Sequence, residues 1–405
     1  MVGWADEYRQ LDDEHLFYWD RGRLARLKQR LESTLREFVN LNYELFNVRA
    51  GETPAGPSIE YEEFSTMIYV GILGGGNISE THARAAFETD GVDVAAIYGQ
   101  NQEKAARLSE RFGGRVCGSL QEFLEHKPLD VVMIGSPSGL HAEQGIAAAQ
   151  RGLHVLVEKP LDITTERADA LISECERAGV KLGVFFQDRV APDIRRLKDL
   201  IAAGTLGKPI LISGRVKWYR PPEYYSGSRW RGTAALDGGG ALMNQGVHTV
   251  DLLLWLMGDV ARVSGRSITA LHDIEVEDTV VATLEFASGA IGTLEAATSV
   301  YPGYPRRLEL TGSEGTVILE HDRIIAADLR TTHVDLVTPT TEPSNASATS
   351  PVVSDVRGHK ELLKDFLRAM ETNGRPVCDG VEGRRSVALV EAIYESARTG
   401  NPVTL

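Results

Sequence analysis

The chain has 405 residues, 42% of them hydrophobic and 25% charged, and a formal net charge of −14. This length allows one or two domains with substantial cores, and the acidic balance argues against nucleic-acid and membrane-surface binding. The sequence has neither an apolar run long enough to span a bilayer nor an apolar signal core at its N-terminus, so we expect a cytoplasmic protein. The few, scattered cysteines indicate neither a disulfide framework nor a metal site: they are Cys117, Cys175 and Cys378.

Residues 1–66 read as a separate N-terminal extension. Leucine and phenylalanine side chains recur at helical spacing between Asp20 and Phe46, which predicts a helix. The following stretch 48–57, VRAGETPAGP, has the composition of a linker. The helix either packs on the body of the protein or on a second subunit, or it serves as an extra recognition element.

Residues 67–187 alternate short apolar runs with amphipathic stretches, which predicts a parallel, doubly wound α/β sheet with right-handed crossovers. The amphipathic stretches are expected to be helices: Glu80–Thr89, Gln102–Phe112 and Thr164–Ala178. The apolar runs are expected to be strands: Met67–Leu73, Val92–Ile97, Leu129–Gly135, His154–Val157 and Lys181–Phe185.

Residues 188–405 change character, because several expected strands follow one another through hairpin-like turns with no helix between them. This pattern predicts an α/β domain with a large, mostly antiparallel open sheet. Its expected strands are Ile210–Trp218, Asp278–Phe286, Ala290–Thr298, Arg307–Thr311 and Thr316–Leu319. Helices are expected to flank the sheet and, near the C-terminus, to pack back on the first domain: Pro192–Ala203, Ala241–Met257, His359–Glu371 and Gly383–Arg398. The stretch 340–354 is rich in Ser, Thr, Pro and Ala, as in a surface loop.

A glycine-rich turn follows the first expected strand. The pattern Gly74-x-Gly76-x-x-Ser79 stands where a strand gives way to a helix. At such a turn the backbone can approach a pyrophosphate, and the helix N-terminus supplies N–H groups and a positive dipole. Ser79 replaces the usual third glycine or alanine. We predict a nicotinamide dinucleotide site here, contacted by Gly74, Gly76, Asn77 and Ile78.

The second expected strand ends without the acid that normally binds the adenosine ribose. Gly99 stands at that position and Gln100 follows it. The missing carboxylate removes repulsion against a 2′-phosphate. Lys104, one helical turn further on, either pairs with such a phosphate or faces solvent, and the same holds for Arg107. We therefore expect Gly99, Gln100 and Lys104 to lie at the cofactor, and these residues favour NADP over NAD.

The next strand is followed by Ser136 and Pro137, at the edge of the sheet where ligands bind in open α/β folds. These two residues are expected to line the nicotinamide ribose. His141 begins the following helix, and it either contacts the cofactor or has a structural role.

Glu158, Lys159 and Pro160 follow the strand after that. Glu158 is expected to bond the cofactor ribose. Burial and a cationic nicotinamide would lower the pKa of Lys159 from about 10.4 towards neutrality, so that its amine can take the proton of a carbinol. The alternative for Lys159 is a surface lysine in a strand–helix turn.

Three glycines, Gly238–Gly240, open a predicted helix on which Asn244, His248 and Asp251 lie near one face. A lone histidine on such a face is usually a satisfied core residue. Asparagine and aspartate flank this one, and Gly246 leaves room for a ligand, so His248 is a candidate site residue.

Taken in this order, these pieces resemble the Gfo/Idh/MocA family, which includes glucose–fructose oxidoreductase and inositol dehydrogenase. The resemblance runs from Met67 to Leu405 and implies a Rossmann domain followed by an α/β domain with an open sheet. Its marks are the Gly74/Gly76 turn, Glu158-Lys159-Pro160, Gln187-x-Arg189, Trp230-Arg231-Gly232, Gly238-Gly239-Gly240 leading to His248, and the tail with Asp379-Gly380-x-Glu382-Gly383-Arg384-Arg385.

The resemblance implies a catalytic lysine at Lys159 and a catalytic histidine at His248. Many members have an aspartate four residues before that histidine. This chain has Asn244 there, whose amide cannot exchange a proton at working pH but can hydrogen-bond a substrate hydroxyl. The resemblance also implies cofactor contacts from the second domain; for Trp230 and Arg231 the alternative is packing of an ordered loop. The residues concerned are Gln187, Trp230 and Arg231.

We therefore expect NAD(P)-dependent hydride transfer to or from a carbinol carbon of a sugar, cyclitol or similar polyol. Arg189 and Tyr224 are expected to orient the substrate together with Asn244. The aromatic cluster 218–225 suits either stacking on a pyranose or a subunit contact. Two alternatives stay open: a redox-neutral glycosidase that holds NAD, and a cofactor-sensing binding protein. We expect a homodimer or homotetramer without a metal, a nucleic-acid partner or a membrane partner.

Overall fold

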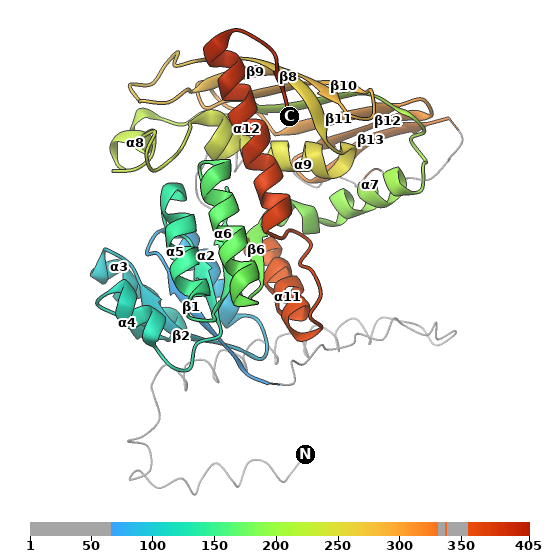
Figure 1. The fold of residues 1–405 in the computed structure, drawn as a ribbon. Helices are drawn as coiled ribbons and strands as arrows, with labels where there is room; N and C mark the ends of the chain where they lie inside the picture. The colour runs from blue at the N-terminus through green and yellow to red at the C-terminus, as the bar shows by residue number, and fades with distance from the viewer. Residues whose placement is uncertain (1–65, 331–336, 338–354) are drawn as a thin grey trace, which may run out of the picture.

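The computed structural model describes residues 66–330, 337 and 355–405. The helix expected between Asp20 and Phe46 and the loop expected at 340–354 lie outside the described residues. Within the described ranges, none of the helices has the length and apolar character needed to cross a bilayer. Figure 1 shows two sheets, each with its own helices, joined by the C-terminal helix α12 (Gly380–Thr399).

The first sheet has six parallel strands in the order β3-β2-β1-β4-β5-β6. Its central strands are buried over most of their length, which explains their apolar runs. The doubly wound parallel sheet is thus confirmed. Its strands are β1 Ile68–Leu73, β2 Val92–Tyr98, β3 Arg115–Val116, β4 Val131–Ile134, β5 His154–Glu158 and β6 Leu182–Phe185. The two-residue strand β3 is too short for a sequence pattern to indicate.

The strand order of this sheet reverses between β1 and β4, because the chain builds outwards from β1 in one direction and from β4 in the other. Ligands in open α/β sheets bind outside the carboxyl ends of the strands at such a reversal. Helices cover both faces: α2 Asn77–Phe87, α3 Gln102–Phe112, α4 Leu120–Glu125, α5 His141–Ala149 and α6 Thr165–Ala178.

The second sheet has eight strands in the order β13-β12-β11-β7-β10-β9-β8-β14. Among the described strands, β7 and β10 form its one parallel pair, so the expectation of a mostly antiparallel sheet is confirmed. The strands are β7 Pro209–Lys217, β8 Val260–Ile268, β9 Thr279–Phe286, β10 Ile291–Ala297, β11 Arg307–Gly312, β12 Gly315–Glu320, β13 Arg323–Leu329 and β14 Val403–Thr404. Strand β8 was not predicted, because serine and arginine interrupt its apolar alternation.

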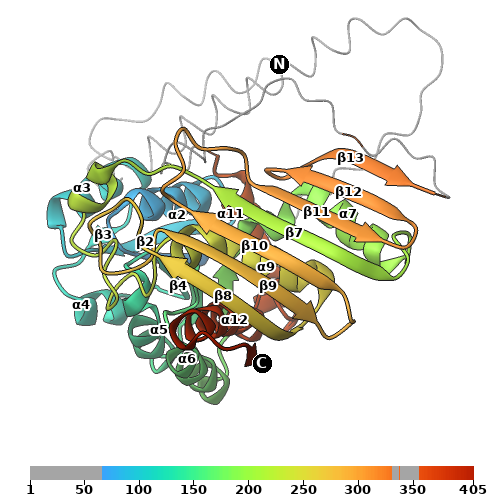
Figure 2. The ribbon, with the colours of Figure 1, turned by 90° about the horizontal axis from the view of Figure 1, so that it is seen from above.

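Helices α7 (Pro192–Ala202), α9 (Val247–Met257) and α12 lie against one face of the second sheet, and Figure 2 looks onto the opposite face. Inward-pointing residues such as Ile212, Leu284 and Leu294 form the core between this sheet and its helices. Because side chains alternate along a strand, the neighbours of these residues face outwards.

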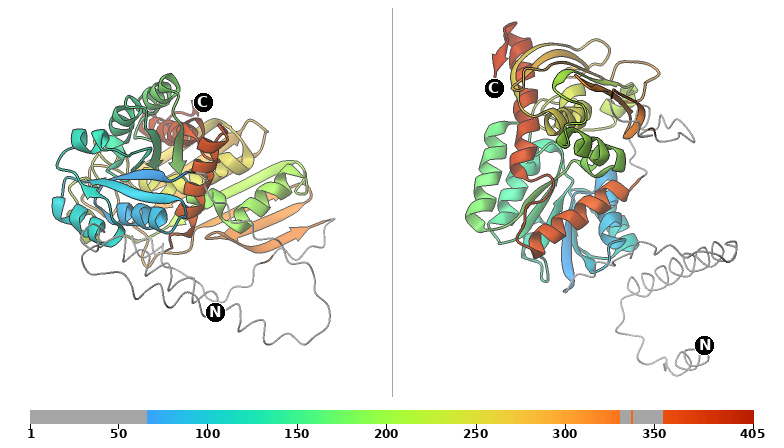
Figure 3. Two further views of the ribbon diagram at one scale, coloured as in Figure 1. Left: turned by 90° about the horizontal axis from the view of Figure 1, so that it is seen from below. Right: turned by 90° about the vertical axis from the view of Figure 1, so that its right-hand side faces the viewer.

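The two C-terminal helices connect the sheets. Helix α11 (Arg357–Glu371) packs beside α2 on the first sheet, and α12 runs from α6 up to β8 of the second sheet (Figure 3). Apolar residues of α11, among them Leu363 and Phe366, belong to the same core as Val70 and Ile72 of β1. The C-terminal tail therefore takes part in both domains.

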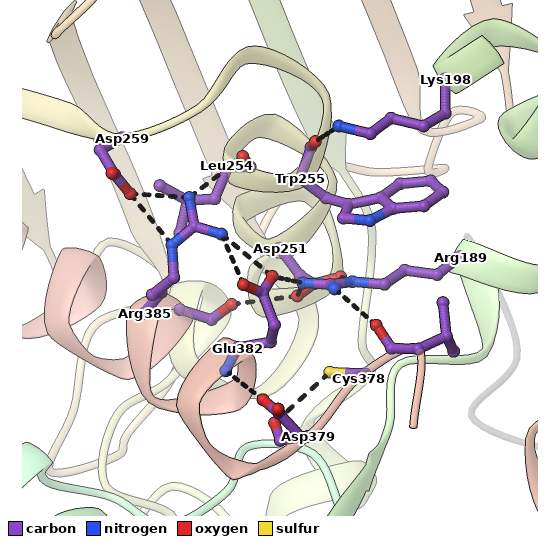
Figure 4. A network of polar contacts seen from close by, with 12 residues as sticks. Arg189, Lys198, Asp251, Leu254, Trp255, Asp259, Cys378, Asp379, Glu382 and Arg385 are labelled. Atoms are coloured by element: carbon purple, nitrogen blue, oxygen red, sulfur yellow. Dashed lines mark hydrogen bonds and ion pairs between the residues drawn. The ribbon is translucent and has the colours of Figure 1, made fainter. Parts of the chain in front are cut away.

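A buried ion-pair network holds α9, α12 and the short 3-10 helix η4 (Gln187–Val190) together (Figure 4). The Arg189 guanidinium donates to both carboxylate oxygens of Asp251, at 2.8 and 2.7 Å, and to the Val377 carbonyl at 3.1 Å. It also lies 3.0 Å from the Glu382 carboxylate. The side chains of Arg189 and Asp251 are each 1% exposed. Arg189 is thus enclosed among its ion-pair partners, and we do not retain it as a substrate-orienting residue.

We predict that replacing Arg189 with methionine lowers the free energy of unfolding by about 3–5 kcal/mol, because it leaves the Asp251 carboxylate buried without its partner. Urea unfolding followed by fluorescence and circular dichroism measures this. The matched control is Arg262→Met, which breaks a half-exposed pair with Glu285 and should cost less than about 1 kcal/mol. Equal losses in the two variants would contradict the role assigned to the network.

Candidate active site

The glycine turn after β1 has the geometry that a dinucleotide requires. Gly74 has a φ of +134°, and a Cβ there would overlap the Ser79 hydroxyl. The glycine therefore makes the room that Ser79 occupies, and the Ser79 hydroxyl donates to the Gly135 carbonyl at 3.4 Å. Gly76 is the N-cap of α2 and offers no side-chain cap. A Cβ at Gly76 would meet nothing within 4 Å, so the helix N-terminus faces open space that suits a pyrophosphate.

The end of β2 lies directly beside this turn. A Cβ at Gly99 would lie 3.1 Å from the Gly74 carbonyl, and a Cβ at Gly75 would lie 3.4 Å from the Cβ of Lys104. Gln100 and Lys104 are exposed. The stem of Lys104 therefore starts next to the phosphate-binding turn, and its ammonium group is free to reach a ligand there.

His141 links two turns at the same sheet edge. Its Nδ1 lies 2.8 Å from the Pro160 carbonyl and its Nε2 lies 3.0 Å from the Ser136 carbonyl. The ring is buried between these two carbonyls, and burial lowers its pKa, so its neutral form donates one N–H to one of them. The structure therefore favours the structural role over cofactor contact. Ser136 and Pro137 themselves are partly exposed.

The Glu158 carboxylate lies between two buried histidines. Its Oε1 accepts from His82 Nε2 at 2.9 Å and from His359 Nε2 at 3.1 Å, and its Oε2 accepts from the Lys159 backbone N–H at 3.2 Å. Burial alone would raise the pKa of Glu158, but the two histidine bonds outweigh it and hold the pKa well below its usual range. Both oxygens already have protein partners, and a bond from Glu158 to a cofactor ribose stays a prediction.

This triad contains residue types that also bind metals. Metal-bound histidines almost always donate their second ring N–H to a carboxylate or a carbonyl. Here the Nδ1 atoms of His82 and His359 are buried and have no hydrogen-bond partner among the described residues. We therefore interpret the triad as two imidazoles whose Nε2–H groups donate to one carboxylate. His82 comes from α2 and His359 from α11, so the triad joins the C-terminal tail to the strand end that carries Lys159.

Lys159 bridges the two domains. Its ammonium donates to the backbone carbonyl of Asn244 at 2.7 Å. Burial lowers the pKa of Lys159, while the charges of Glu158, Asp237 and Asp188 oppose that shift. The direction is the one expected from the sequence, and it brings the amine closer to the range in which a general base works.

The helix that carries Asn244 begins as a π-helix, Ala241–Gly246, and continues as α9. Short π-helical turns of this kind occur mostly at functional sites, and this one alters the predicted α-helical spacing between Asn244 and His248. Its N-terminus is held by Glu277, which accepts from the N–H groups of Gly240 and Leu242 at 2.8 Å each. A Cβ at Gly240 would overlap the Glu277 carbonyl, so the third glycine is needed for this close approach.

The side chain of Asn244 is held between two others. Its Nδ2 donates to Asp237 at 2.6 Å, and its Oδ1 accepts from Gln245 at 3.0 Å. Gln245 also donates to the Tyr224 hydroxyl at 3.1 Å. Tyr224 is thereby linked to Asn244, and the Arg231 guanidinium lies 4.3 Å from the centre of its ring.

His248 faces an aspartate. Its Nδ1 lies 3.4 Å from the Asp188 carboxylate, which also pairs with Arg306. Burial lowers the pKa of His248 to about 3, so the imidazole is neutral at physiological pH. His248 Nδ1 is buried and makes no hydrogen bond among the described residues. In the neutral tautomer with the proton on Nδ1, the Nε2 lone pair can accept a hydrogen bond.

Hydrogen bonds thus connect Lys159, Asn244 and Tyr224 by way of Gln245, and His248 lies near enough to Lys159 for the charge of Lys159 to lower its pKa. The structure places Trp230 against Arg231, at 5.2 Å from ring centre to guanidinium. Gln187 packs on Gly358 of α11. Sequence reasoning missed several titratable residues around these side chains, because their partners are remote in the chain: His82, Asp188, Asp237, Glu277, Arg306 and His359.

We predict that His82 makes folding stability depend on pH. Burial lowers the pKa of His82 below 6.5 in the folded state. Below about pH 6.5, His82 therefore binds a proton in the unfolded chain and stays neutral in the folded chain. Stability is therefore lost as pH falls, by at most about 1.4 kcal/mol per pH unit for this group.

The variant His82→Gln keeps a donor for Glu158 and removes this titration. Its deficit in unfolding free energy relative to wild type should shrink as pH is lowered from about 7.5 to about 5 in urea titrations. A deficit that stays constant over that range would show that His82 does not titrate as the burial requires.

Comparison with known proteins gives a consistent result. Residues 68–186 match the family described as "Oxidoreductase family, NAD-binding Rossmann fold", and residues 194–318 match the "GFO/IDH/MocA C-terminal domain". The chain is 30% identical over 339 residues to D-xylose 1-dehydrogenase (NADP(+)) 2 of Haloferax volcanii, covering 83% of this chain and 99% of that protein. It is 26% identical to myo-inositol 2-dehydrogenase of Thermotoga maritima, covering 83% and 98%.

Among solved structures, the chain is similar to the WlbA dehydrogenase from Bordetella pertussis, described in complex with NADH and UDP-GlcNAcA. The TM-score is 0.75 and the sequence identity is 33%, with 84% of this chain and 98% of that chain covered.

Proposed function

Because the chain belongs to the Gfo/Idh/MocA family of oxidoreductases, we propose that it transfers a hydride between a nicotinamide cofactor and a secondary carbinol of a sugar, cyclitol or sugar derivative. The observation that carries this proposal is the 2.7 Å bond from the Lys159 ammonium to the Asn244 carbonyl. It sets an acid–base group from the sheet edge against the helix of the second domain. In this proposal residues 67–187 hold the cofactor, and residues 188–405 hold the substrate and the subunit contacts.

Lys159 is the proposed acid–base group. In the oxidation direction its neutral amine takes the hydroxyl proton, and in the reduction direction its ammonium returns that proton. The lowered pKa of Lys159 increases the neutral fraction that oxidation needs. The Asn244 carbonyl can hold the ammonium form but cannot remove its proton, so the group remains available in both directions.

His248 is proposed to hold the same oxygen through Nε2. An imidazole with a pKa of about 3 is a poor proton store at neutral pH, so it acts as a hydrogen-bonding partner while Lys159 carries the proton. Asn244 and Tyr224 are proposed to orient the remaining hydroxyl groups through the hydrogen-bonded chain that joins them by way of Gln245.

The bound nicotinamide supplies the hydride acceptor or donor. Gly74, Gly76 and the uncapped N-terminus of α2 would hold its pyrophosphate, since the space in front of Gly76 is open. Further proposed contacts come from both domains: Asn77, Ile78, Gly99, Gln100, Ser136, Pro137, Glu158, Gln187, Trp230 and Arg231.

We further propose that NADP is preferred to NAD, through the ammonium of Lys104 beside the glycine turn. Lys104→Glu should then lower the ratio of kcat/KM with NADP to kcat/KM with NAD by about tenfold or more, which corresponds to losing roughly 1.4 kcal/mol at the 2′-phosphate. Initial rates with each cofactor measure this. Lys364→Glu is the control, because the Lys364 side chain is 38% exposed on α11, where it pairs with Glu361. An unchanged ratio in Lys104→Glu would leave Lys104 as a solvated residue.

We propose a homodimer or homotetramer that forms through the outer face of the second sheet. Leu211, Val281 and Ile291 lie on adjacent strands of that face and are 45%, 50% and 56% exposed. Apolar side chains grouped in this way are typical of a subunit contact. Molar mass in solution, measured by light scattering, checks the assembly.

The proposed activity predicts that Lys159→Ala loses turnover by about 10²- to 10⁴-fold, the usual contribution of a general acid–base group. Cofactor affinity, measured by fluorescence quenching, should change little, because the pyrophosphate is held by the turn after β1. Lys364→Ala is the matched control and should keep full activity. Undiminished turnover in Lys159→Ala would remove this residue from the mechanism.

A further inference from the structure

A buried carboxylate that the proposed mechanism does not use lies directly before the three glycines. Asp237 is 1% exposed. Its Oδ1 accepts from the Asn244 side chain at 2.6 Å, and its Oδ2 accepts from the Gly232 N–H at 2.8 Å. The backbone carbonyl of Asn244 in turn accepts a hydrogen bond from the Lys159 ammonium at 2.7 Å. Asp237, Asn244 and Lys159 therefore form one polar chain.

We propose that Asp237 is a positioning residue of this active site, which fixes the Asn244 side chain and supplies the negative charge that acts on Lys159. This proposal rests on the proposed function, in which Lys159 is the acid–base group. An amide at position 244 carries no charge, so the carboxylates that favour the ammonium form of Lys159 are Glu158, Asp237 and Asp188. Of these three, Asp237 is the one that bonds the Asn244 side chain.

A purely structural role would be to hold the loop through Gly232 alone. Two observations argue for more. First, the other carboxylate oxygen of Asp237 accepts a hydrogen bond from the side chain of Asn244, which is itself part of the proposed site. Second, Lys159 and Arg231 are the cations whose charges act on Asp237. A buried carboxylate is costly unless such partners compensate it.

The groups that act on Asp237 come from each element packed around it. They are Lys159 after β5, Arg231 and Tyr224 and Tyr225 from the segment around α8 (Pro222–Ser226), Asn244 from the π-helix, and Tyr394 from α12. Burial raises the pKa of Asp237 to about 6, and the bonds from Gly232 and Asn244 and the charge of Lys159 oppose this shift. The negative charge therefore develops as pH rises through about 6.

The charge of Asp237 favours the ammonium form of Lys159 and offsets part of the effect of burial. Removing the charge while keeping the shape, as in Asp237→Asn, should leave the effect of burial opposed only by the charges of Glu158 and Asp188. The pKa of Lys159 should then fall, because one of the opposite charges that favour its ammonium form is lost. A loop-stiffening role would alter stability and leave the titration of Lys159 where it is.

The test measures the Lys159 titration directly, without relying on turnover. The full-length protein is trace-labelled with acetic anhydride at a series of pH values, and the extent of labelling at Lys159 is read by mass spectrometry. The expected result is a lower midpoint for Lys159 in Asp237→Asn than in wild type. The pH profile of kcat/KM for carbinol oxidation should shift in the same direction. An unchanged labelling midpoint would overturn the proposal.

Two variants sharpen the result. Glu277→Gln weakens the same helix start through Gly240, Leu242 and Tyr394, and it should leave the Lys159 midpoint in place, whereas an equal shift there would overturn the proposal. The exchange Asp237→Asn with Asn244→Asp restores both the charge and a hydrogen bond between the two positions. It should return the midpoint towards wild type, and it keeps the test decisive if Asp237→Asn does not fold.

Because labelling needs no substrate, the two proposals fail separately. An inactive wild-type protein with the expected shift in Asp237→Asn would contradict the proposed reaction and support the role of Asp237. An active wild-type protein with no shift in Asp237→Asn would support the proposed reaction and contradict the role of Asp237.

Discussion

The contact between the Lys159 ammonium and the Asn244 carbonyl is the interaction on which the site depends. It requires the end of β5 and the start of the π-helix to meet at one point, although they belong to different sheets. Three features support that meeting. The His82–Glu158–His359 triad fixes the strand end, Glu277 caps the π-helix, and Gly240 lets the backbone at Glu277 approach closely. The geometry of the proposed active site is therefore a consequence of long-range packing.

Burial favours the neutral form of each of three titratable groups in the site. It lowers the pKa of Lys159 and of His248 and raises that of Asp237, so each group is pushed towards its neutral form. Hydrogen bonds and nearby opposite charges limit the effect. A site of this kind can exchange a single proton with a carbinol without holding several unpaired charges away from water, which suits a reaction that moves one hydride and one proton.

The local features were predictable and the distant ones were not. The glycine turn at Gly74, the lysine after β5 and the parallel sheet follow from short patterns, because each depends on neighbours in the chain. The partners of Asn244 and His248 do not, since Asp237 and Asp188 meet them only after folding. Arg189 lies close to other site residues in the sequence, yet its bidentate pair with Asp251 buries it elsewhere. The π-helical start of α9 likewise depends on Glu277. This residue lies 37 positions after Gly240 and 35 positions after Leu242, the two residues whose N–H groups it accepts.

The most direct test of hydride transfer at this site is the absorbance of reduced nicotinamide, followed with NAD and NADP separately over free sugars, inositols, glycosides and sugar nucleotides that include a uronic acid. The account predicts cofactor reduction that is stoichiometric with oxidation of one substrate class. Cleavage of a glycoside without net change in the cofactor would contradict it in favour of a redox-neutral glycosidase. Cofactor binding with no reaction on any class would contradict it in favour of a sensor.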